Sequence, residues 1–481
     1  MSKEITIKPV TRIEGHAKVT LQLDDAGEVT EARFHVMELR GFEKFMEGRM
    51  FWEAPLITPR ICGICSVSHH LAAAKACDDL LGVDIPPAAK LQRELLHEGE
   101  IIGDHALHLY FLAAPDLLLG PDAPPEQRNV VGLIAADPDL AGRGVALRKI
   151  AQNLVEVVGG RSTHPVTAIP GGMSKPLSHN ERHELLAQVH VAVDHARVTL
   201  DVIRAAGEKH ADLFAKMDGV VTPFVALTDN GNFAFYDGTV KVIDSEGAAL
   251  AEFAPAAYAD YIGEHAEDWS YMKFPYFKAL GYPDGIYRVG PLARLNVNSR
   301  MGTPLADAAL KEFKAQADGP VQGTMQYHHA RAINLLYACE RTVELLEDPA
   351  ICDENARTPA KRRAGEGIGI VEAPRGLLIH HYAADDMGHL TKVNLIVATC
   401  HNNAAINKSV ATAARAFIHD GEPREGLLNR VEMAIRAYDP CLSCGTHAMT
   451  RGPALTLEVR DAAGTLMQTV RRDERGRQDC I

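Results

Sequence analysis

The sequence predicts a mainly helical protein with β-rich pieces at its periphery. Long stretches carry apolar side chains at helical spacing, whereas shorter alternating stretches begin the chain and occur between residues 220 and 297. Hydrophobic residues make up 46% of the 481 positions, which is enough for a large core. We expect a body spanning 1–447, with 220–297 as a β-rich insertion and 448–481 as a C-terminal extension.

The opening segment predicts three strands. Residues 5–10, 16–23 and 29–37 alternate apolar with polar side chains, and the Asp-Asp-Ala-Gly stretch at 24–27 forms a turn between the last two.

Helical spacing then dominates the chain. The predicted helices are 65–81, 87–113, 139–158, 180–207, 304–317, 323–346, 404–417 and 425–438. Pro86 and Pro87 favour the start of the second, and Gly82 the end of the first.

Three further stretches are expected to be non-helical. The proline-rich stretch 115–128 predicts a loop, and 369–382 with 389–399 predicts two strands around a turn at 385–388. The glycines of 365–369 lack the spacing and the following helix of a nucleotide-binding loop.

Composition excludes several classes of protein. The chain has 50 basic and 63 acidic residues, a net charge of -13, which argues against a general nucleic-acid binder. It contains no apolar run of the roughly 18–20 residues that a membrane helix needs, and its first residues lack a secretory pattern. Nine cysteines, an odd and sparse set, suit a reducing compartment. We therefore expect a cytoplasmic protein without a membrane span.

Four of the nine cysteines form two Cys-x-x-Cys pairs at opposite ends of the chain. The pairs are Cys62 with Cys65 and Cys441 with Cys444, and a histidine follows each, His69 or His447. Four thiolates can hold a soft transition metal, so the fold between them must bring the pairs together.

The pattern alone leaves several kinds of site open. Two such pairs fit a structural zinc site, although zinc modules usually place their pairs about 12–20 residues apart. A disulfide-exchange motif needs only one pair. Four cysteines also suit an iron–sulfur cluster, or a catalytic centre in which thiolates bridge two ions. At this point the pattern supports a zinc site and a redox-metal site equally.

Six short motifs separate these alternatives. They are VTRIEGH (10–16), RGFEKF (40–45), RICGICSVSHH (60–70), GGRSTHP (159–165) with PGG (170–172), VEAPRG (371–376) and RAYDPCLSCGTH (436–447). Together they resemble the large, catalytic subunit of the nickel–iron hydrogenases across residues 6–447.

Two longer segments refine this resemblance. Residues 107–118 and 278–297 resemble the soluble cytoplasmic branch, first the viologen-reducing type that partners heterodisulfide reductase and second the NAD-reducing type. The fold also resembles a quinone-site subunit of respiratory complex I, which lacks these cysteines.

The resemblance implies a nickel ion and an iron ion with carbon monoxide and two cyanides as ligands. Cys62 and Cys441 would be terminal nickel ligands, and Cys65 and Cys444 would bridge to the iron.

The resemblance also implies the groups that handle hydrogen, in a reaction that splits H2 heterolytically. Cys441 would take the proton, and Glu14 would relay it outward. Arg375 would lie over the site, polarise H2 and bind a cyanide, positioned by Asp104 and Asp439.

Other implied contacts surround the metals. Pro374 and Thr399 would contact the iron's small ligands. Glu43, the carbonyl of Leu395 and His447 would bind magnesium, a hard ion that prefers oxygen ligands and retains waters.

The histidines are expected to have different roles. His69 would orient a cysteine sulfur through a hydrogen bond, and His164 would face a small subunit. His70, His105 and His108 are expected to be packed residues without a role at the site.

The resemblance implies several partners. No paired cysteines remain for an iron–sulfur relay, so a small subunit must carry the electrons taken from H2. Further electron-transfer subunits, of the heterodisulfide reductase type or an NAD-linked flavoprotein, would follow. A maturation protease would cut after His447 and remove residues 448–481.

Two other functions stay open. One is a structural or electron-coupling subunit with a degenerate site, against which the four cysteines and Arg375 argue. The other is a scaffold protein held together by zinc at the four cysteines, which metal analysis would distinguish.

Overall fold

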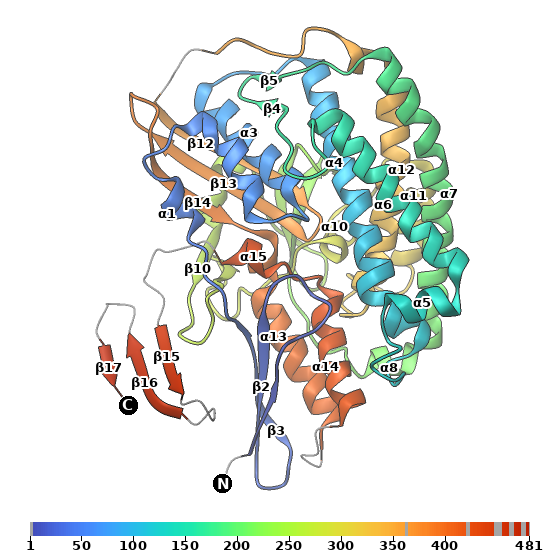
Figure 1. Ribbon diagram of the computed structural model, residues 1–481, viewed down its shortest axis with the longest axis vertical. Coiled ribbons are helices and arrows are strands. Elements are labelled where there is room, and N and C mark those ends of the chain that lie inside the picture. The colour runs from blue at the N-terminus through green and yellow to red at the C-terminus, as the bar shows by residue number, and fades with distance from the viewer. Residues whose placement is uncertain are drawn as a thin grey trace.

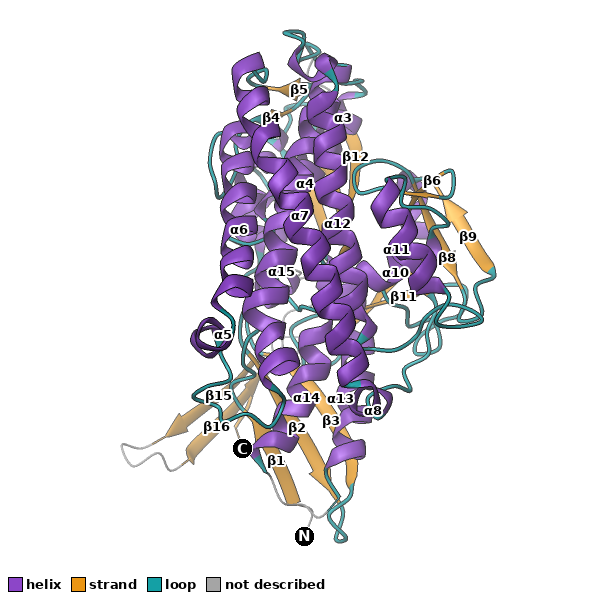
Figure 2. Ribbon diagram, turned by 90° about the vertical axis from the view of Figure 1, so that its right-hand side faces the viewer, coloured by secondary structure: helices purple, strands orange, loops and turns teal. Residues whose placement is uncertain are grey.

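A bundle of long helices forms the body of the computed structural model (Figure 2). Its members are α4 (Pro87–Leu107), α6 (Pro138–Gly159), α7 (His179–Lys209) and α12 (Gln326–Glu347). Helix α4 contacts α6 and α12, and α7 packs on the same two helices. The structure describes residues 3–360, 364–419 and 424–446, and beyond them the backbone of three strands.

Local sequence explains how these helices form and approach one another. Ser178 and Glu181 make a capping box that satisfies the first N–H groups of α7. Gly99 and Gly103 lie on the side of α4 that faces α6. A Cβ atom at Gly99 would lie 2.5 Å from Cδ2 of Leu154, so a larger residue here would force that side chain to move.

The end of α4 differs from the prediction. The helix was expected to reach residue 113, followed by a loop at 115–128. Instead α4 ends at Leu107, and wider π-helical turns cover His108–Ala113 and Pro115–Leu119. Pro115 has no N–H, so the regular ladder of hydrogen bonds cannot continue through it. The loop prediction is wrong for its first five residues.

A three-stranded antiparallel sheet packs beside the bundle (Figure 1). Its strands are β12 (Gly365–Ala373), β13 (Gly376–Ala384) and β14 (Leu390–Ile396). The predicted single strand over 369–382 is wrong, because the chain reverses at Pro374 and Arg375. Gly376 has φ 136, a backbone conformation that glycine adopts easily.

The glycines of β12 have a packing role. Helix α3 (Ser66–Leu81) lies on this strand. A Cβ atom at Gly367 would lie 2.1 Å from the Ala76 carbonyl oxygen, and one at Gly369 would lie 2.0 Å from that of Ala72. The glycine-rich stretch therefore admits a helix against a strand.

Residues 220–297 contain mostly strands and short segments. A four-stranded sheet has the order β7-β6-β8-β9, and β10 pairs with β11. The elements are β6 (Phe224–Asp229), β7 (Asn232–Phe233), β8 (Thr239–Ile243), β9 (Ala249–Phe253), α9 (Tyr258–Tyr261), β10 (Ile262–His265), β11 (Phe274–Phe277) and α10 (Pro291–Val297). This region lies to one side of the bundle (Figure 2).

The remaining elements include the two ends of the described chain. They are β1 (Lys3–Ile7), β2 (Ala17–Leu23), β3 (Val29–Val36), α1 (Phe42–Met46), α2 (Ala54–Ile57), α5 (Val130–Ala136), β4 (Ala168–Ile169), β5 (Gly172–Met173), α8 (Ala211–Ala215), α11 (Pro304–Lys314), α13 (Ala398–Phe417), α14 (Glu425–Ala437), α15 (Leu442–Gly445), β15 (Leu455–Arg460), β16 (Leu466–Arg472) and β17 (Gln478–Cys480). Helix α13 begins six residues before the predicted position 404, which places Thr399 in its first turn.

The N-terminal sheet lies against the C-terminal helices. Strands β1, β2 and β3 form an antiparallel sheet, and β3 packs on α13 (Figure 1). Within the described part of the chain, no helix combines the length and apolar character required to cross a bilayer. The predicted fold class, mainly helical with peripheral strands, is confirmed.

Candidate metal centre

The two Cys-x-x-Cys pairs meet in the interior. Cys62 and Cys65 lie just before α3. Cys441 lies at the start of α15, and Cys444 lies within it. The Sγ–Sγ distances are 3.3 Å for Cys62 and Cys441, 3.1 Å for Cys65 and Cys444, and 2.9 Å for Cys441 and Cys444. The four sulfur atoms all lie within 4.8 Å of one another, and all four residues are buried.

This geometry fits a metal. Sulfur ligands bind at about 2.3 Å, so two sulfurs on one ion lie at most about 4.6 Å apart. Hydrogen bonds from Cys441 hold the pKa of the Cys62 thiol well below its ordinary value, whereas burial raises the pKa of Cys441. A cation bound here would favour the thiolate form of every cysteine.

Backbone contacts bring the distant segments together. The N–H of Leu442 donates to the carbonyl oxygen of Glu14 at 3.1 Å, and Glu14 pairs with Cys441 in an isolated parallel bridge. Gly15 has φ +83, and a Cβ atom there would lie 2.8 Å from Cβ of Leu442. Glycine is therefore required where the N-terminal segment crosses the second cysteine pair.

Polar side chains fix this crossing. The carboxylate of Glu14 accepts hydrogen bonds from the N–H and the hydroxyl of Ser443, the first at 3.0 Å. The Thr399 hydroxyl oxygen accepts from the N–H of Cys441 at 3.0 Å. Both side chains thus contact the loop that carries Cys441 and Cys444.

Arg375 is buried between two carboxylates. Its Nη1 lies 2.7 Å from Asp104 Oδ2, and its Nη2 lies 3.1 Å from Asp439 Oδ2. Nε also donates to the Asp439 carbonyl oxygen at 2.5 Å. Although burial opposes the charge, Asp104 and Asp439 raise the pKa of Arg375 well above its ordinary value, and Cys441 and Cys65 act in the same direction. The cation therefore persists beside the sulfur atoms.

The turn that carries Arg375 is itself held by a buried arginine. Arg294 Nε donates to Glu372 at 2.7 Å, and its other nitrogens donate to the carbonyl oxygens of Ala373 and Pro374. Gly290 allows the Arg375 backbone to approach, because a Cβ atom there would lie 2.5 Å from the Arg375 carbonyl oxygen. Pro374 contributes its shape and its carbonyl group to this turn.

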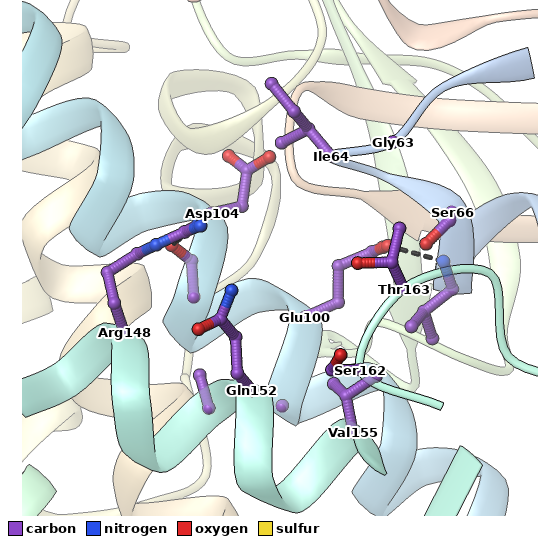
Figure 3. A pocket seen from close by; sticks show the side chains of 14 residues that line it. Gly63, Ile64, Ser66, Glu100, Asp104, Arg148, Gln152, Val155, Ser162 and Thr163 are labelled. Atoms are coloured by element: carbon purple, nitrogen blue, oxygen red, sulfur yellow. Dashed lines mark hydrogen bonds between the residues drawn. The ribbon is translucent and has the colours of Figure 1, made fainter. Parts of the chain in front are cut away.

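A cavity of about 100 Å³ lies beside the first cysteine pair (Figure 3). Gly63 and Ile64, the residues between Cys62 and Cys65, line it together with Asp104. Glu100 lies at its side and points toward the start of α3.

Sequence reasoning missed Glu100. Its carboxylate accepts hydrogen bonds from the N–H groups of Val67 and Ser68, at 2.6 and 2.9 Å, and from the Ser68 hydroxyl. The N-terminus of a helix favours a negative charge there. Burial nevertheless raises the pKa of Glu100 to about 8. Its position four residues before Asp104, on the same face of α4, was the available signal.

The predicted magnesium ligands are described in part. Glu43 is buried, and its Oε1 accepts from the N–H of Leu395 at 2.8 Å. His447 lies outside the described residues. An acidic oxygen beside a strand backbone suits a hard cation.

The histidines occupy varied environments. His70 is packed as expected, with its ring between the Pro55 carbonyl and the Ala168 N–H. His69 Nδ1 lies 3.1 Å from His380 Nε2. His164 is half-buried, and its N–H donates to the Ser66 hydroxyl at 3.3 Å.

His108 differs from its expected role as a packed residue. Its Nδ1 lies 3.1 Å from Asp439 Oδ1, so it belongs to the surroundings of Arg375. His105 is also buried, with Nδ1 3.8 Å from Asp104 Oδ1. Asp104 and His108 lie four residues apart in the helix predicted over 87–113, which indicated a shared face, but the nearness of Asp439 depends on the tertiary fold.

Comparison with known proteins agrees with this geometry. The family model described as nickel-dependent hydrogenase matches residues 40–119 and 207–447, and a HoxL-like model matches residues 4–39. The chain is 47% identical over 417 residues to a vhu F420-non-reducing hydrogenase subunit of Methanococcus voltae, covering 87% of this chain and 99% of the relative. It is 44% identical to the beta subunit of the NAD-reducing hydrogenase HoxS of Cupriavidus necator, covering 99% of this chain and all of the relative.

Solved structures show the same fold. An NAD+-reducing [NiFe]-hydrogenase in the H2-reduced state superposes with a TM-score of 0.90 at 46% identity, covering 92% of this chain and 99% of the other. The Ni-Fe-Se hydrogenase of D. vulgaris Hildenborough superposes with a TM-score of 0.77 at 26% identity, covering 93% of this chain and 100% of the other. With the four converging cysteines, these similarities show that the chain belongs to the nickel-dependent hydrogenases, as their large, catalytic subunit.

Proposed function

We propose that this protein splits H2 reversibly and heterolytically at a nickel–iron centre held by Cys62, Cys65, Cys441 and Cys444. The convergence of these four sulfur atoms within 4.8 Å carries the proposal. When bound, the nickel–iron group supplies the centre that polarises H2 and accepts its electrons. In our assignment, Cys62 and Cys441 bind nickel alone, and the other two bridge to iron.

Arg375 would bind and polarise H2. Two carboxylates fix its guanidinium at one orientation, and the charge faces Cys441 and Cys65. A preoriented cation stabilises developing negative charge without further reorganisation. Asp104 and Asp439 are accordingly positioning residues.

Three groups would hold the iron's carbon monoxide and cyanides. The Thr399 hydroxyl accepts the Cys441 N–H, which leaves its own proton free to donate to a cyanide. Arg375 would donate to the second cyanide, beside the Pro374 turn.

Cys441 and Glu14 would move the proton. Glu14 hydrogen-bonds Ser443, and its backbone pairs with Leu442, so it lies against the loop of Cys441. It is also half-buried, which supports a role between the centre and solvent. A carboxylate can accept the proton on one side and release it on the other.

A magnesium ion would stabilise the C-terminal end of the site. Glu43 supplies a buried oxygen beside Leu395, whose carbonyl group and the His447 imidazole would complete the protein ligands. The ion would retain waters, as magnesium commonly does.

Electrons require a partner protein. Among the described residues, the four cysteines are the one cluster suited to a metal, and Cys77, Cys339, Cys352 and Cys400 are separate and buried. We infer an iron–sulfur small subunit beside His164, followed by subunits of the heterodisulfide reductase type, with an NAD-linked flavoprotein as the alternative. The names of the relatives, F420-non-reducing and NAD-reducing hydrogenase subunits, support both. We place the complex in the cytoplasm.

Maturation would remove residues 448–481. A protease would cut after His447 once nickel is bound. The expectation that an uncut tail keeps the second cysteine pair away from the centre is wrong, because the four sulfur atoms lie within 4.8 Å of one another in the uncut chain. Mass spectrometry of active enzyme tests this step, since an intact Ile481 end would contradict it.

Infrared spectroscopy and metal analysis of the purified complex test the proposed centre. We expect nickel in equal amount to the large subunit. We also expect iron whose carbon monoxide and cyanide ligands give infrared bands between the amide and thiol regions. Zinc alone would indicate a scaffold, and a metal-free, inactive complex would indicate a degenerate coupling subunit. Nickel-loaded, active protein without those bands would contradict the iron ligands.

A further inference from the structure

Helix α12 carries a fully buried arginine near the ion pairs of Arg375. Arg331 is 0% exposed, and α12 contacts both α4, which carries Asp104, and α14, which ends shortly before Asp439. Burial lowers the pKa of Arg331 to about 10, while the charges of Asp439 and Asp104 raise it and that of Arg375 lowers it. Arg331 is therefore a cation at neutral pH, within reach of the same two carboxylates.

The charges of this cluster balance only with Arg331 included. Two buried carboxylates contact the single guanidinium of Arg375. Burial lowers the pKa of His105 to about 4 and that of His108 well below its ordinary value, so neither ring supplies a second positive charge. An unbalanced charge in the interior is unfavourable. Arg331 supplies the second cation.

Arg331 also holds the end of α14. Its Nη2 donates to the carbonyl oxygen of Ala437, the last residue of that helix, at 3.1 Å. The last carbonyl groups of a helix have no partner within it and carry partial negative charge, so a cation there is favourable. One turn earlier on α12, the ring of Tyr327 packs on that of Tyr438, with centroids 4.7 Å apart. Helix α12 thus contacts both residues that precede Asp439.

The direction of the chain at Asp439 decides how Arg375 is oriented. Asp439 has φ 55, a left-handed conformation that is uncommon outside glycine and has to be held by surrounding contacts. Its Oδ2 lies 3.1 Å from Arg375 Nη2, and its carbonyl oxygen accepts from Arg375 Nε at 2.5 Å. A change at the end of α14 would therefore move two of the groups that fix the guanidinium.

We propose that Arg331 is a positioning residue for H2 cleavage. It fixes the chain at Ala437 and balances the second carboxylate, and through Asp439 it keeps the guanidinium of Arg375 in one orientation. The hydrogen bonds of Arg331 go to backbone carbonyl groups, so it acts through other residues. This inference rests on the proposed reaction at the four cysteines.

Two substitutions separate the charge of Arg331 from its donor groups. Arg331→Gln keeps a donor for Ala437 without the charge, whereas Arg331→Lys keeps the charge. In the purified complex, we expect kcat for H2 oxidation per nickel to fall about tenfold in Arg331→Gln, less than the loss on removing a donor that contacts the reacting atoms. KM should change little, because the lost contact acts mainly in the transition state. Arg331→Lys should lie between wild type and Arg331→Gln, and a lysine variant as slow as the glutamine variant would contradict the charge balance.

Infrared spectroscopy gives a readout that does not depend on the rate. The carbon monoxide and cyanide bands should shift in Arg331→Gln, because the charge beside the centre changes, and should stay near wild type in Arg331→Lys. Unshifted bands in Arg331→Gln would overturn the proposal.

Arg93→Gln is the matched control. Arg93 is also 0% exposed, donates to the carbonyl oxygens of Ile169 and Gly172, and lies 2.6 Å from Asp78. Its loss should lower the thermal midpoint but leave the bands and kcat per nickel at wild-type values. Equal effects of Arg93→Gln and Arg331→Gln on the bands would indicate a merely structural role for Arg331 and overturn the proposal.

A double-mutant cycle tests whether Arg331 acts through Asp439. In an Asp439→Asn background the carboxylate that Arg331 balances is gone, so adding Arg331→Gln should lower kcat by less than about twofold. A full tenfold loss in that background would contradict the proposal. A wild-type complex that carries nickel but cleaves no H2 would instead overturn the proposed function itself.

Discussion

Replacement of Asp104 by asparagine tests the buried ion pair that orients Arg375. The two side chains are 1% and 4% exposed, and their charged atoms lie 2.7 Å apart. Breaking a buried pair by removing one partner costs about 3–5 kcal/mol. Asp439 remains 3.1 Å from Arg375 Nη2, and the asparagine carbonyl can still accept from Nη1. We therefore expect a loss of about 2 kcal/mol in the free energy of unfolding, below the range for a fully broken pair.

Thermal denaturation of the nickel-loaded complex measures this loss. The entropy of unfolding is about 2.1 cal/mol/K per residue, so 481 residues convert 2 kcal/mol into a shift of about 2 °C in the midpoint. Asp122→Asn is the matched control. Asp122 pairs with Arg430 at 2.7 Å but is 66% exposed, and surface pairs contribute about 0–1 kcal/mol. Equal shifts in the two variants at equal nickel content would refute this reasoning.

Three further predictions follow from single contacts. Arg375→Lys should retain nickel but lower H2 oxidation about 100-fold, because one ammonium cannot make both carboxylate contacts; an unchanged rate would contradict the role of the guanidinium. Burial holds the Glu100 pKa at about 8, against 4.5 for an exposed glutamate, so the folded state disfavours the ionised form. The contribution of Glu100 to stability therefore declines as the pH rises from about 4.5 to about 8. The midpoint of Glu100→Gln should therefore rise relative to wild type across that window, and a constant difference would exclude this explanation. Gly369→Ala should lower the free energy of unfolding by about 1–3 kcal/mol, because its Cβ would lie 2.0 Å from the Ala72 carbonyl oxygen. The control Gly142→Ala, with no atom within 4 Å, should be neutral or stabilising. Similar thermal midpoints for the two variants would contradict the close packing of α3 on β12.

Periodicity predicted the elements whose environment is regular. Helices α3, α6 and α7 follow the expected ranges closely, because their apolar positions face one core throughout. The errors occur where tertiary contacts override local pattern. The turn at Pro374 and Arg375 lies within an apolar stretch that looks like one strand, and the buried Arg294 that supports it is 80 positions away from Pro374. No local signal could reveal that partner.

The cysteines were predictable from their spacing, but the polar residues packed around them were predictable only in part. Asp104 and Asp439 were implied by the family resemblance, Asp439 within a motif and Asp104 outside the motifs, and the structure brings both to Arg375. Glu100 was missed and His108 was expected only to be packed, because the contact of Glu100 with the start of α3 and that of His108 with Asp439 depend on the tertiary fold. Buried polar residues in helices are visible in a sequence only as interruptions of an apolar face.

A residue outside both cysteine segments makes hydrogen bonds to both of them. The N–H of Arg40 donates to the Thr446 carbonyl oxygen at 2.7 Å, directly after the second pair. Its guanidinium donates to the carbonyl oxygens of Arg60 and Ile61, directly before the first pair. Arg40 thus joins both stretches of chain that carry the sulfur atoms. The carbonyl groups that it contacts have no sequence signature, so only the fold reveals how this first residue of the RGFEKF stretch holds together two loops whose sulfur atoms converge.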